Sequence, residues 1–174
     1  MKPNHRTEIR LISDLEVLIT RVFDAPRELV FRAHTDPSLI PLWWGPRNTT
    51  TIVETMDVRP GGAWRFIHRS DDGSEYGFRG EFREILPPER LVQTSEFEGA
   101  PGHIVLETIT FEEQFGQTTV KVLDLCASIE DRDAMLASGM EEGLEETYDR
   151  LAELVAQQSA AAREVRPNAT GEIQ

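Results

Sequence analysis

ITRVFDAPRELVFRAHTDPSLIPLWWGP, from Ile19 to Pro46, carries the strongest structural signals in the chain. Alternating apolar residues lead to a break at Ala25-Pro26, an amphipathic helical pattern follows, and two adjacent tryptophans stand between Pro41 and Pro46. Two neighbouring indoles carry so much apolar surface that at least one has to be buried, and a short segment held by prolines can bury them only by folding over a larger surface. We interpret this segment as a lid.

The elements within and before this stretch follow from its periodicity. Residues Glu16–Phe23 alternate with a period of two, which indicates a strand. Pro26 suits the first position of a helix, because its missing N–H needs no partner there. A second short helix is expected to start after Asp36-Pro37 and to run through Trp43.

Several strand-like segments come next, separated by turn sequences such as PGG at 60–62 and DDG at 71–73. Short connections of this kind join neighbouring antiparallel strands. The predicted strands are 50–58, 63–69, 76–85, 91–97, 104–115 and 118–127.

From Arg132 the period changes to that of a helix, with an apolar stripe and an acidic outer face. The stripe consists of Leu136, Met140, Leu144, Tyr148, Leu151 and Val155. We expect a helix of about 25 residues, which is long enough to cross a whole sheet.

These elements predict an α+β fold with a curved antiparallel sheet of six or seven strands, wrapped around the long C-terminal helix. The two short helices follow the first strand and cap one end of the gap between sheet and helix. We expect an N-terminal extension at 1–15, a single domain at 16–158 and a flexible tail at 159–174.

Charge and cysteine content restrict the function. The chain has 31 Asp and Glu against 18 Lys and Arg, a net charge of -13. Such a field repels nucleic acids and anionic membranes, so we expect neither as a partner. The single cysteine, Cys126, excludes an intramolecular disulfide, and the N-terminus lacks the apolar core of a secretory signal. We expect a cytoplasmic protein that contains no membrane span.

A set of motifs in this order resembles a known family. The motifs are RVFDAPRELVFRA, TDP, WWGP, VRPGG, GEFREILPPERLV, FEE and SGMEEGLEETYDRLAEL. The chain resembles, over roughly residues 16–157, the activator-of-heat-shock-chaperone-ATPase homologues, a branch of the START-like (SRPBCC) superfamily. The resemblance implies a helix-grip fold with a cavity between sheet and helix, but it implies no particular ligand, because such relatives have diverse functions.

Two residues depart from the pattern of that family. His34 stands where many relatives carry Trp, and Ser95 stands where an aromatic residue is common. Both departures would change the shape or polarity of a ligand site if these positions line it. The chain also has no room for the separate N-terminal domain of the eukaryotic chaperone regulator, so chaperone activation is not implied by name.

Aromatic side chains alternate on two neighbouring strands, and with the lid and the last helix they predict the wall of an apolar cavity. The same residues could instead fill a solid core. The candidate ligand-binding residues are Trp43, Trp44, Trp64, Phe66, His68, Tyr76, Phe78, Phe97, Met140 and Tyr148.

Individual roles stay open for several of these residues. Neighbours on a helix point about 100° apart, so we expect one of Trp43 and Trp44 in the core and the other at the cavity rim. His68 either hydrogen-bonds a ligand and acts as an acid or base, or has a structural role. Met140 either lines the cavity or fills the core.

One acidic residue also has two interpretations. Glu107 and Thr108 are adjacent on a predicted strand, so one of the two points inward, although a solvated Glu107 is the default. The sequence contains no nucleophile motif, phosphate loop or dinucleotide fingerprint, and its four histidines lack metal-ligand spacing. We therefore expect no metal and no cofactor, and we assign no catalytic residue.

The leading hypothesis is a carrier or sensor that encloses a small hydrophobic or aromatic molecule between the sheet and the long helix. The first alternative is an enzyme of the cyclase, dehydratase or hydrolase type that acts on such a molecule. The second is an interaction protein that uses its acidic helix face on a basic partner such as a chaperone. A homodimer is compatible with each of them.

Overall fold

One antiparallel sheet of eight strands is the central element of the computed structural model, which describes residues 5–164. Its strands are β1 (Glu8–Leu11), β2 (Glu16–Phe23), β3 (Thr49–Met56), β4 (Ala63–Ser70), β5 (Glu75–Leu86), β6 (Arg90–Phe97), β7 (Val105–Gln114) and β8 (Gln117–Leu125). They lie in the order β1-β2-β8-β7-β6-β5-β4-β3.

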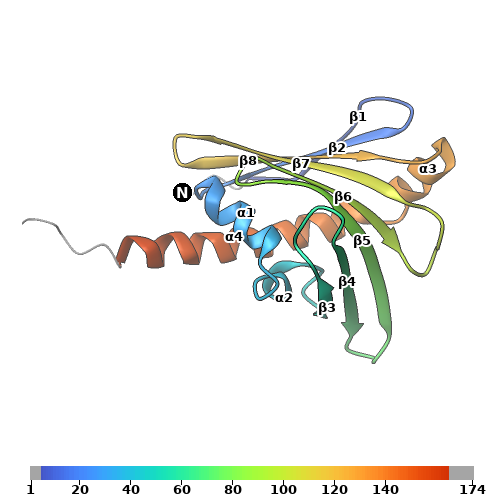
Figure 1. Ribbon diagram of the computed structural model, residues 1–174, viewed down its shortest axis with the longest axis horizontal. Coiled ribbons are helices and arrows are strands. Elements are labelled where there is room, and N and C mark those ends of the chain that lie inside the picture. The colour runs from blue at the N-terminus through green and yellow to red at the C-terminus, as the bar shows by residue number, and fades with distance from the viewer. Residues whose placement is uncertain (1–4, 165–174) are drawn as a thin grey trace, which may run out of the picture.

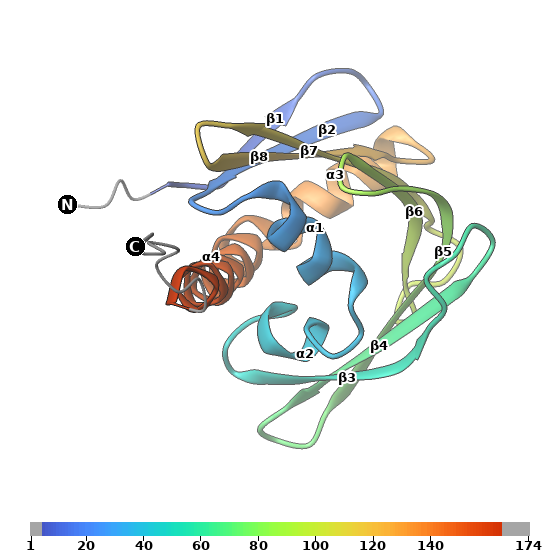
Figure 2. The same cartoon turned by 60° about the vertical axis from the view of Figure 1, so that its left-hand side comes forward.

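The helices of the described residues gather around the concave face of this sheet. They are α1 (Arg27–Thr35), α2 (Ile40–Trp43), α3 (Ile129–Ala137) and α4 (Met140–Glu164). The sheet curves so strongly that it wraps around the side where α1, α2 and α4 lie (Figure 1, Figure 2). The helix-grip fold and the α+β class expected from the sequence are thereby confirmed.

The predicted number of six or seven strands is wrong, because β1 adds an eighth. This strand lies inside the segment that we expected to be an N-terminal extension, and it pairs with β2 through Glu8–Thr20 and Leu11–Val17. It is short, mostly exposed and charged at alternate positions, as is typical of an edge strand that is protected from further pairing.

The last helical region is divided, where the sequence predicted one continuous helix. Gly139 separates α3 from α4 with a φ of 77°, a conformation that glycine adopts without steric cost. The side chain of Ser128 caps α3 by accepting the N–H of Asp131. The helix α4 continues to Glu164, so the tail predicted at 159–174 is wrong for 159–164, and its remainder lies outside the described residues.

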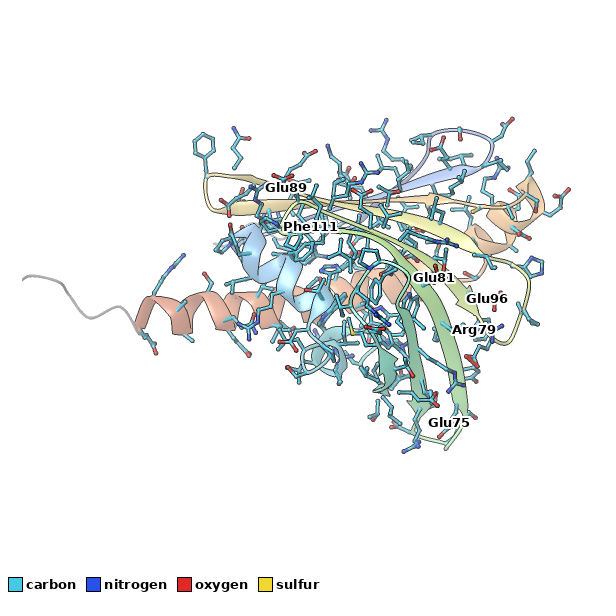
Figure 3. All side chains as sticks on the ribbon, in the orientation of Figure 1. Glu75, Arg79, Glu81, Glu89, Glu96 and Phe111 are labelled. Carbon is cyan, nitrogen blue, oxygen red and sulfur yellow. The ribbon has the colours of Figure 1, made fainter. Side chains whose placement is uncertain are left out.

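The core lies between the sheet and the helices. Alternate residues of β2 are buried, as the period of two predicted, and Leu151 and Val155 of α4 are almost completely buried. Phe111 of β7, which is labelled in Figure 3, packs edge-to-face on Phe31 of α1 with 5.1 Å between ring centroids. No helix within residues 5–164 is long and apolar enough to cross a bilayer.

Candidate functional site

A cavity of about 470 Å³ lies between the concave face of the sheet, the lid segment and α4. Most of the predicted ligand-binding residues line it. They are Trp43, Trp44, Trp64, Phe66, His68, Phe78, Met140 and Tyr148. Met135 of α3 also lines this cavity.

Tyr76 and Phe97 lie outside this lining. Their exposed fractions are 46% and 39%, and their ring centroids are 6.4 Å apart. Tyr76 is the second residue of β5, near the turn of the β4–β5 hairpin, which projects away from the helices (Figure 1). Strand alternation places these rings on the same side as Phe78, but no helix within residues 5–164 covers that end of the sheet (Figure 1), so the aromatic wall ends at Phe78.

The two tryptophans of the lid occupy different surroundings. Trp43 is 3% exposed, and its Nε1 donates to the carbonyl oxygen of Ala33 at 2.9 Å. Trp44 turns toward the strands, with its ring centroid 5.0 Å from Phe66 and 5.3 Å from Phe78. Trp43 therefore anchors α2 to the end of α1, while Trp44 lies at the centre of the aromatic wall.

The lid is fastened to the rest of the protein through main-chain carbonyl groups. Arg150 of α4 donates to the carbonyl oxygens of Gly45 at 2.7 Å and Leu42 at 3.2 Å. On the opposite side, the hydroxyl of Thr51 donates to the carbonyl oxygen of Trp44. These bonds hold the Trp-Trp segment between α4 and β3.

Two histidines on the cavity wall are neutral near pH 7. Burial lowers the pKa of His34 to about 4, although the bond from its Nδ1 to the carbonyl oxygen of Val30 (2.8 Å) acts in the other direction. Burial, and then the charge of Arg150, lowers the pKa of His68 to about 4. The Nε2 of His68 is buried and lacks a hydrogen-bond partner among the described residues. It can therefore bond to a ligand.

A row of polar side chains crosses the opposite part of the wall. Gln93 of β6 stands opposite Glu107 of β7, and Glu107 stands opposite Asp124 of β8. All three line the cavity, and the Nε2 of Gln93 donates to Oε2 of Glu107 at 2.9 Å. The default that we applied to Glu107, a solvated side chain, is therefore wrong. We name Gln93, Glu107 and Asp124 the polar row.

Asp124 and Gln93 are not among the site residues predicted from the sequence. Alternation could have located Asp124, because it shares a strand face with Val120 and Val122, both of which are buried. The same rule places Glu107 with Ile109. The strand pattern therefore places both carboxylates on the inward face. Carboxylates are so seldom buried, however, that this pattern alone was not enough to predict that they line the cavity.

The two carboxyl groups of the polar row are more basic than usual. Burial raises the pKa of Glu107, partly offset by hydrogen bonds from Gln93 and Ser95. Burial, and then the charge of Glu107, raises the pKa of Asp124 well above its ordinary value. Asp124 is 6% exposed, and its Oδ1 lacks a hydrogen-bond partner among the described residues. Burial and then these two carboxylates also raise the pKa of Tyr148, which faces them from α4.

This arrangement can orient a guest molecule and exchange protons with it. Apolar walls exclude water, while the polar row offers acceptors and, when protonated, a donor. Within residues 5–164 no group of three or more His, Cys, Asp or Glu side chains is placed to hold a metal ion. The thiol of Cys126 is buried, and burial raises its pKa.

The family model described as activator of Hsp90 ATPase homolog 1-like protein (AHSA1) matches residues 24–156. The chain belongs to this family. A protein from Rhodobacter sphaeroides with a known crystal structure shares 27% identity, with a TM-score of 0.82 over 87% of this chain and 99% of that one. The Mycobacterium smegmatis protein Ms6760 shares 25% identity, with a TM-score of 0.77 over 86% and 96% of the two chains. No curated protein matches the sequence.

The two departures from the AHSA1 pattern both face the cavity. His34 of α1 and Ser95 of β6 belong to its lining. The ring of His34 lies 4.9 Å from Trp43 and 5.1 Å from Phe111, so an imidazole takes part in an otherwise aromatic cluster. Ser95 hydrogen-bonds Glu107 and thereby lowers the pKa of that carboxyl. Each departure makes the wall more polar than the aromatic residue expected in the AHSA1 family would.

Proposed function

We propose that this protein binds a small, largely hydrophobic or aromatic molecule in the cavity between the sheet and α4. The observation that carries the proposal is the cavity itself, about 470 Å³ in volume and lined mainly by aromatic and aliphatic side chains with a few polar groups pointing inward. Cavities of roughly 300–1,000 Å³ with this composition are typical of small-molecule sites.

The polar groups explain how such a ligand would be oriented. His68 and the polar row lie on different strands, so a molecule that spans the cavity can bond at one end or both. The unbonded Nε2 of His68 and Oδ1 of Asp124 each have an unused hydrogen-bonding position. Buried polar atoms are costly to leave unpaired, and a ligand that pairs them therefore gains affinity.

A ligand screen tests this proposal. The protein is mixed with a library of apolar and aromatic metabolites, and binding is measured by native mass spectrometry and by thermal shift. The variant Leu144→Trp should lose most of the binding, because Leu144 lines the cavity and a larger side chain would fill it. The control is the same change at Leu86, which is 47% exposed at the end of β5. If no compound binds, or if Leu144→Trp binds as well as the control, the proposal is wrong.

Acid–base catalysis on the bound molecule is a second candidate. The observation that favours it is the cavity-lining pair of Glu107 and Asp124, because raised pKa values are typical of groups that transfer protons in catalysis. The test is incubation of a binder with the protein and chemical analysis of the products over time. Product that forms with the native chain but not with Asp124→Asn would support catalysis, and unchanged binder would refute it.

We do not extend to this chain the chaperone activation that the family description mentions. The features that support our proposal lie in the cavity and not on an outer surface that could contact a chaperone. A cytoplasmic location and a homodimer stay predictions from the sequence.

A further inference from the structure

The polar row contains two carboxylates for which the described residues provide no cation. Glu107 and Asp124 take part in none of the ion pairs found among residues 5–164. The nearby buried cation, Arg21 of β2, already pairs with Asp149 at 2.8 Å and Glu145 at 3.5 Å. The charge of the two carboxylates is therefore not balanced from within the wall.

The position of Asp124 shows where a cation would be bound. Asp124 is nine-tenths buried, lines the cavity, and has a free Oδ1, while Glu107 directly opposite has one oxygen occupied by Gln93. Residues directly opposite on antiparallel strands have Cβ atoms roughly 5 Å apart. A single donor group that enters the cavity can therefore contact both carboxylates at once.

The rest of the wall suits the body of an aromatic cation. Trp44, Phe66 and Phe78 present clustered rings to the same cavity, with centroids of Trp44 and Phe66 5.0 Å apart. Aromatic faces attract cations as well as apolar groups. An anionic ligand is disfavoured, because it would have to approach two carboxylates in a medium that screens charge poorly.

We propose that the ligand is a small aromatic or apolar amine, whose protonated nitrogen binds between Glu107 and Asp124 while its hydrocarbon body contacts Trp44 and Phe66. This inference rests on the function proposed above and specifies the chemical class of the ligand. The amine supplies the positive charge that the polar row lacks and pairs the free oxygen of Asp124.

A matched pair of probes tests the amine preference. The amine is 2-(1-naphthyl)ethylamine and the neutral control is 2-(1-naphthyl)ethanol, which has the same rings and chain. Binding of each is measured by isothermal titration calorimetry at about pH 7.5 and low salt. A hydrogen bond to a charged group contributes about 1.5–3 kcal/mol, so the amine should bind at least about tenfold more tightly than the alcohol.

Variants locate the source of the preference. Glu107→Gln and Asp124→Asn should each bring the two dissociation constants to within about threefold of each other, with little change for the alcohol. The control is Glu112→Gln, the same change on the outer part of β7, where Glu112 is exposed and pairs with Lys121. This variant should keep the full preference.

Proton release gives a second readout. The titratable groups that line the cavity are Glu107, Asp124, Tyr148, His34 and His68, and the charge of Asp124 also acts on Cys126. Burial raises the pKa of both carboxyl groups, and a bound ammonium group would lower both pKa values, so any proton that the pair holds at the working pH should be released into the buffer. Calorimetry in two buffers of different ionisation enthalpy measures this release, which the alcohol should not cause.

The outcomes separate the two proposals. If the alcohol binds as tightly as the amine, or if Asp124→Asn keeps the preference, the amine inference is overturned while the cavity proposal stands. If neither probe binds but neutral compounds from the library do, the amine inference is again overturned. If nothing binds in either experiment, both proposals are wrong.

Discussion

The Nη1 atom of Arg150 lies 2.7 Å from the carbonyl oxygen of Gly45. This bond joins the long helix to the loop that follows the Trp-Trp pair, and the Nη2 atom adds a bond to the carbonyl oxygen of Leu42 at 3.2 Å. A planar guanidinium can bond several carbonyl groups at once, which the flexible ammonium of lysine cannot do with the same geometry. One side chain of α4 thus bonds to the main chain on both sides of the Trp-Trp pair.

Removal of the hydrogen bonds from Arg150 to the lid should destabilise the protein. Arg150→Gln loses the bonds to Gly45 and Leu42 and should lower the free energy of unfolding by about 1–2 kcal/mol. The measurement is urea denaturation followed by tryptophan fluorescence. The control is Arg163→Gln, on the exposed last turn of the same helix. Equal stability of the two variants would show that the hydrogen bonds of Arg150 to the lid contribute nothing to the free energy of unfolding.

The two lid tryptophans should respond differently to the same change. Trp43→Phe removes the donor to the carbonyl oxygen of Ala33 in the core and should cost about 1–3 kcal/mol of stability. Trp44→Phe keeps an aromatic ring in the cavity wall, so we expect a smaller loss of stability and a larger change in ligand affinity. Denaturation and ligand titration of both variants test this, and a reversed order of the two stability losses would contradict it.

Asp124→Asn should stabilise the empty protein. The pKa of Asp124 in the folded state is raised above its unfolded value, so the native state binds more protons between these two values. Stability is consequently complete below the unfolded pKa, about 3.8, and is lost as the pH rises through the folded pKa. The variant avoids this loss and should gain about 1 kcal/mol or more near pH 8.

Denaturation at two pH values measures this effect. The gain of Asp124→Asn over the native chain should be largest near pH 8 and should shrink near pH 4, where the native carboxyl is protonated as well. The control is Asp133→Asn on α3, at an exposed position whose change should stay within about 0.5 kcal/mol. A variant that is less stable than the native chain at pH 8 would show that Asp124 is better solvated than its burial implies.

Acid should weaken the fold through His34. Its pKa is lowered from 6.5 to about 4, so the unfolded chain binds a proton more readily between these values and stability falls as the pH falls through them. The loss from this residue is up to about 3 kcal/mol. His34→Phe should flatten this part of the profile. Urea denaturation of both proteins between pH 7 and 4 is the test, and parallel profiles would contradict the assignment.

Most of the sheet and its order along the chain were predictable, because seven strands alternate clearly or are bounded by turn sequences. The eighth strand was not, since β1 has four residues and carries charges at Glu8 and Arg10. The strand β1 is defined by its hydrogen bonds to β2 and not by a local sequence pattern. The break at Gly139 was missed for a related reason, because apolar residues continue at helical spacing on both sides of it.

The candidate site was predictable in its apolar part and not in its polar part. Aromatic residues on alternate strand positions located the wall, but alternation cannot tell how far the helices reach, so Tyr76 and Phe97 were included. Glu107 and Asp124 lie where the pattern would place core residues, against the strong tendency of carboxylates to be exposed. Buried charge of this kind has to be seen in three dimensions before it can be interpreted.

The polar row also affects how securely the strands are aligned. If β7 slipped by one residue, Ile109 would turn outward, which is unfavourable, but Glu107 would turn into water, which is favourable. The same holds for Val122 and Asp124 if β8 slipped. The energy difference that protects the correct alignment is thus smaller here than in a wholly apolar sheet. A ligand that neutralises the carboxylates would bind only when the strands are correctly aligned. Its binding would therefore stabilise the correct register relative to the slipped one.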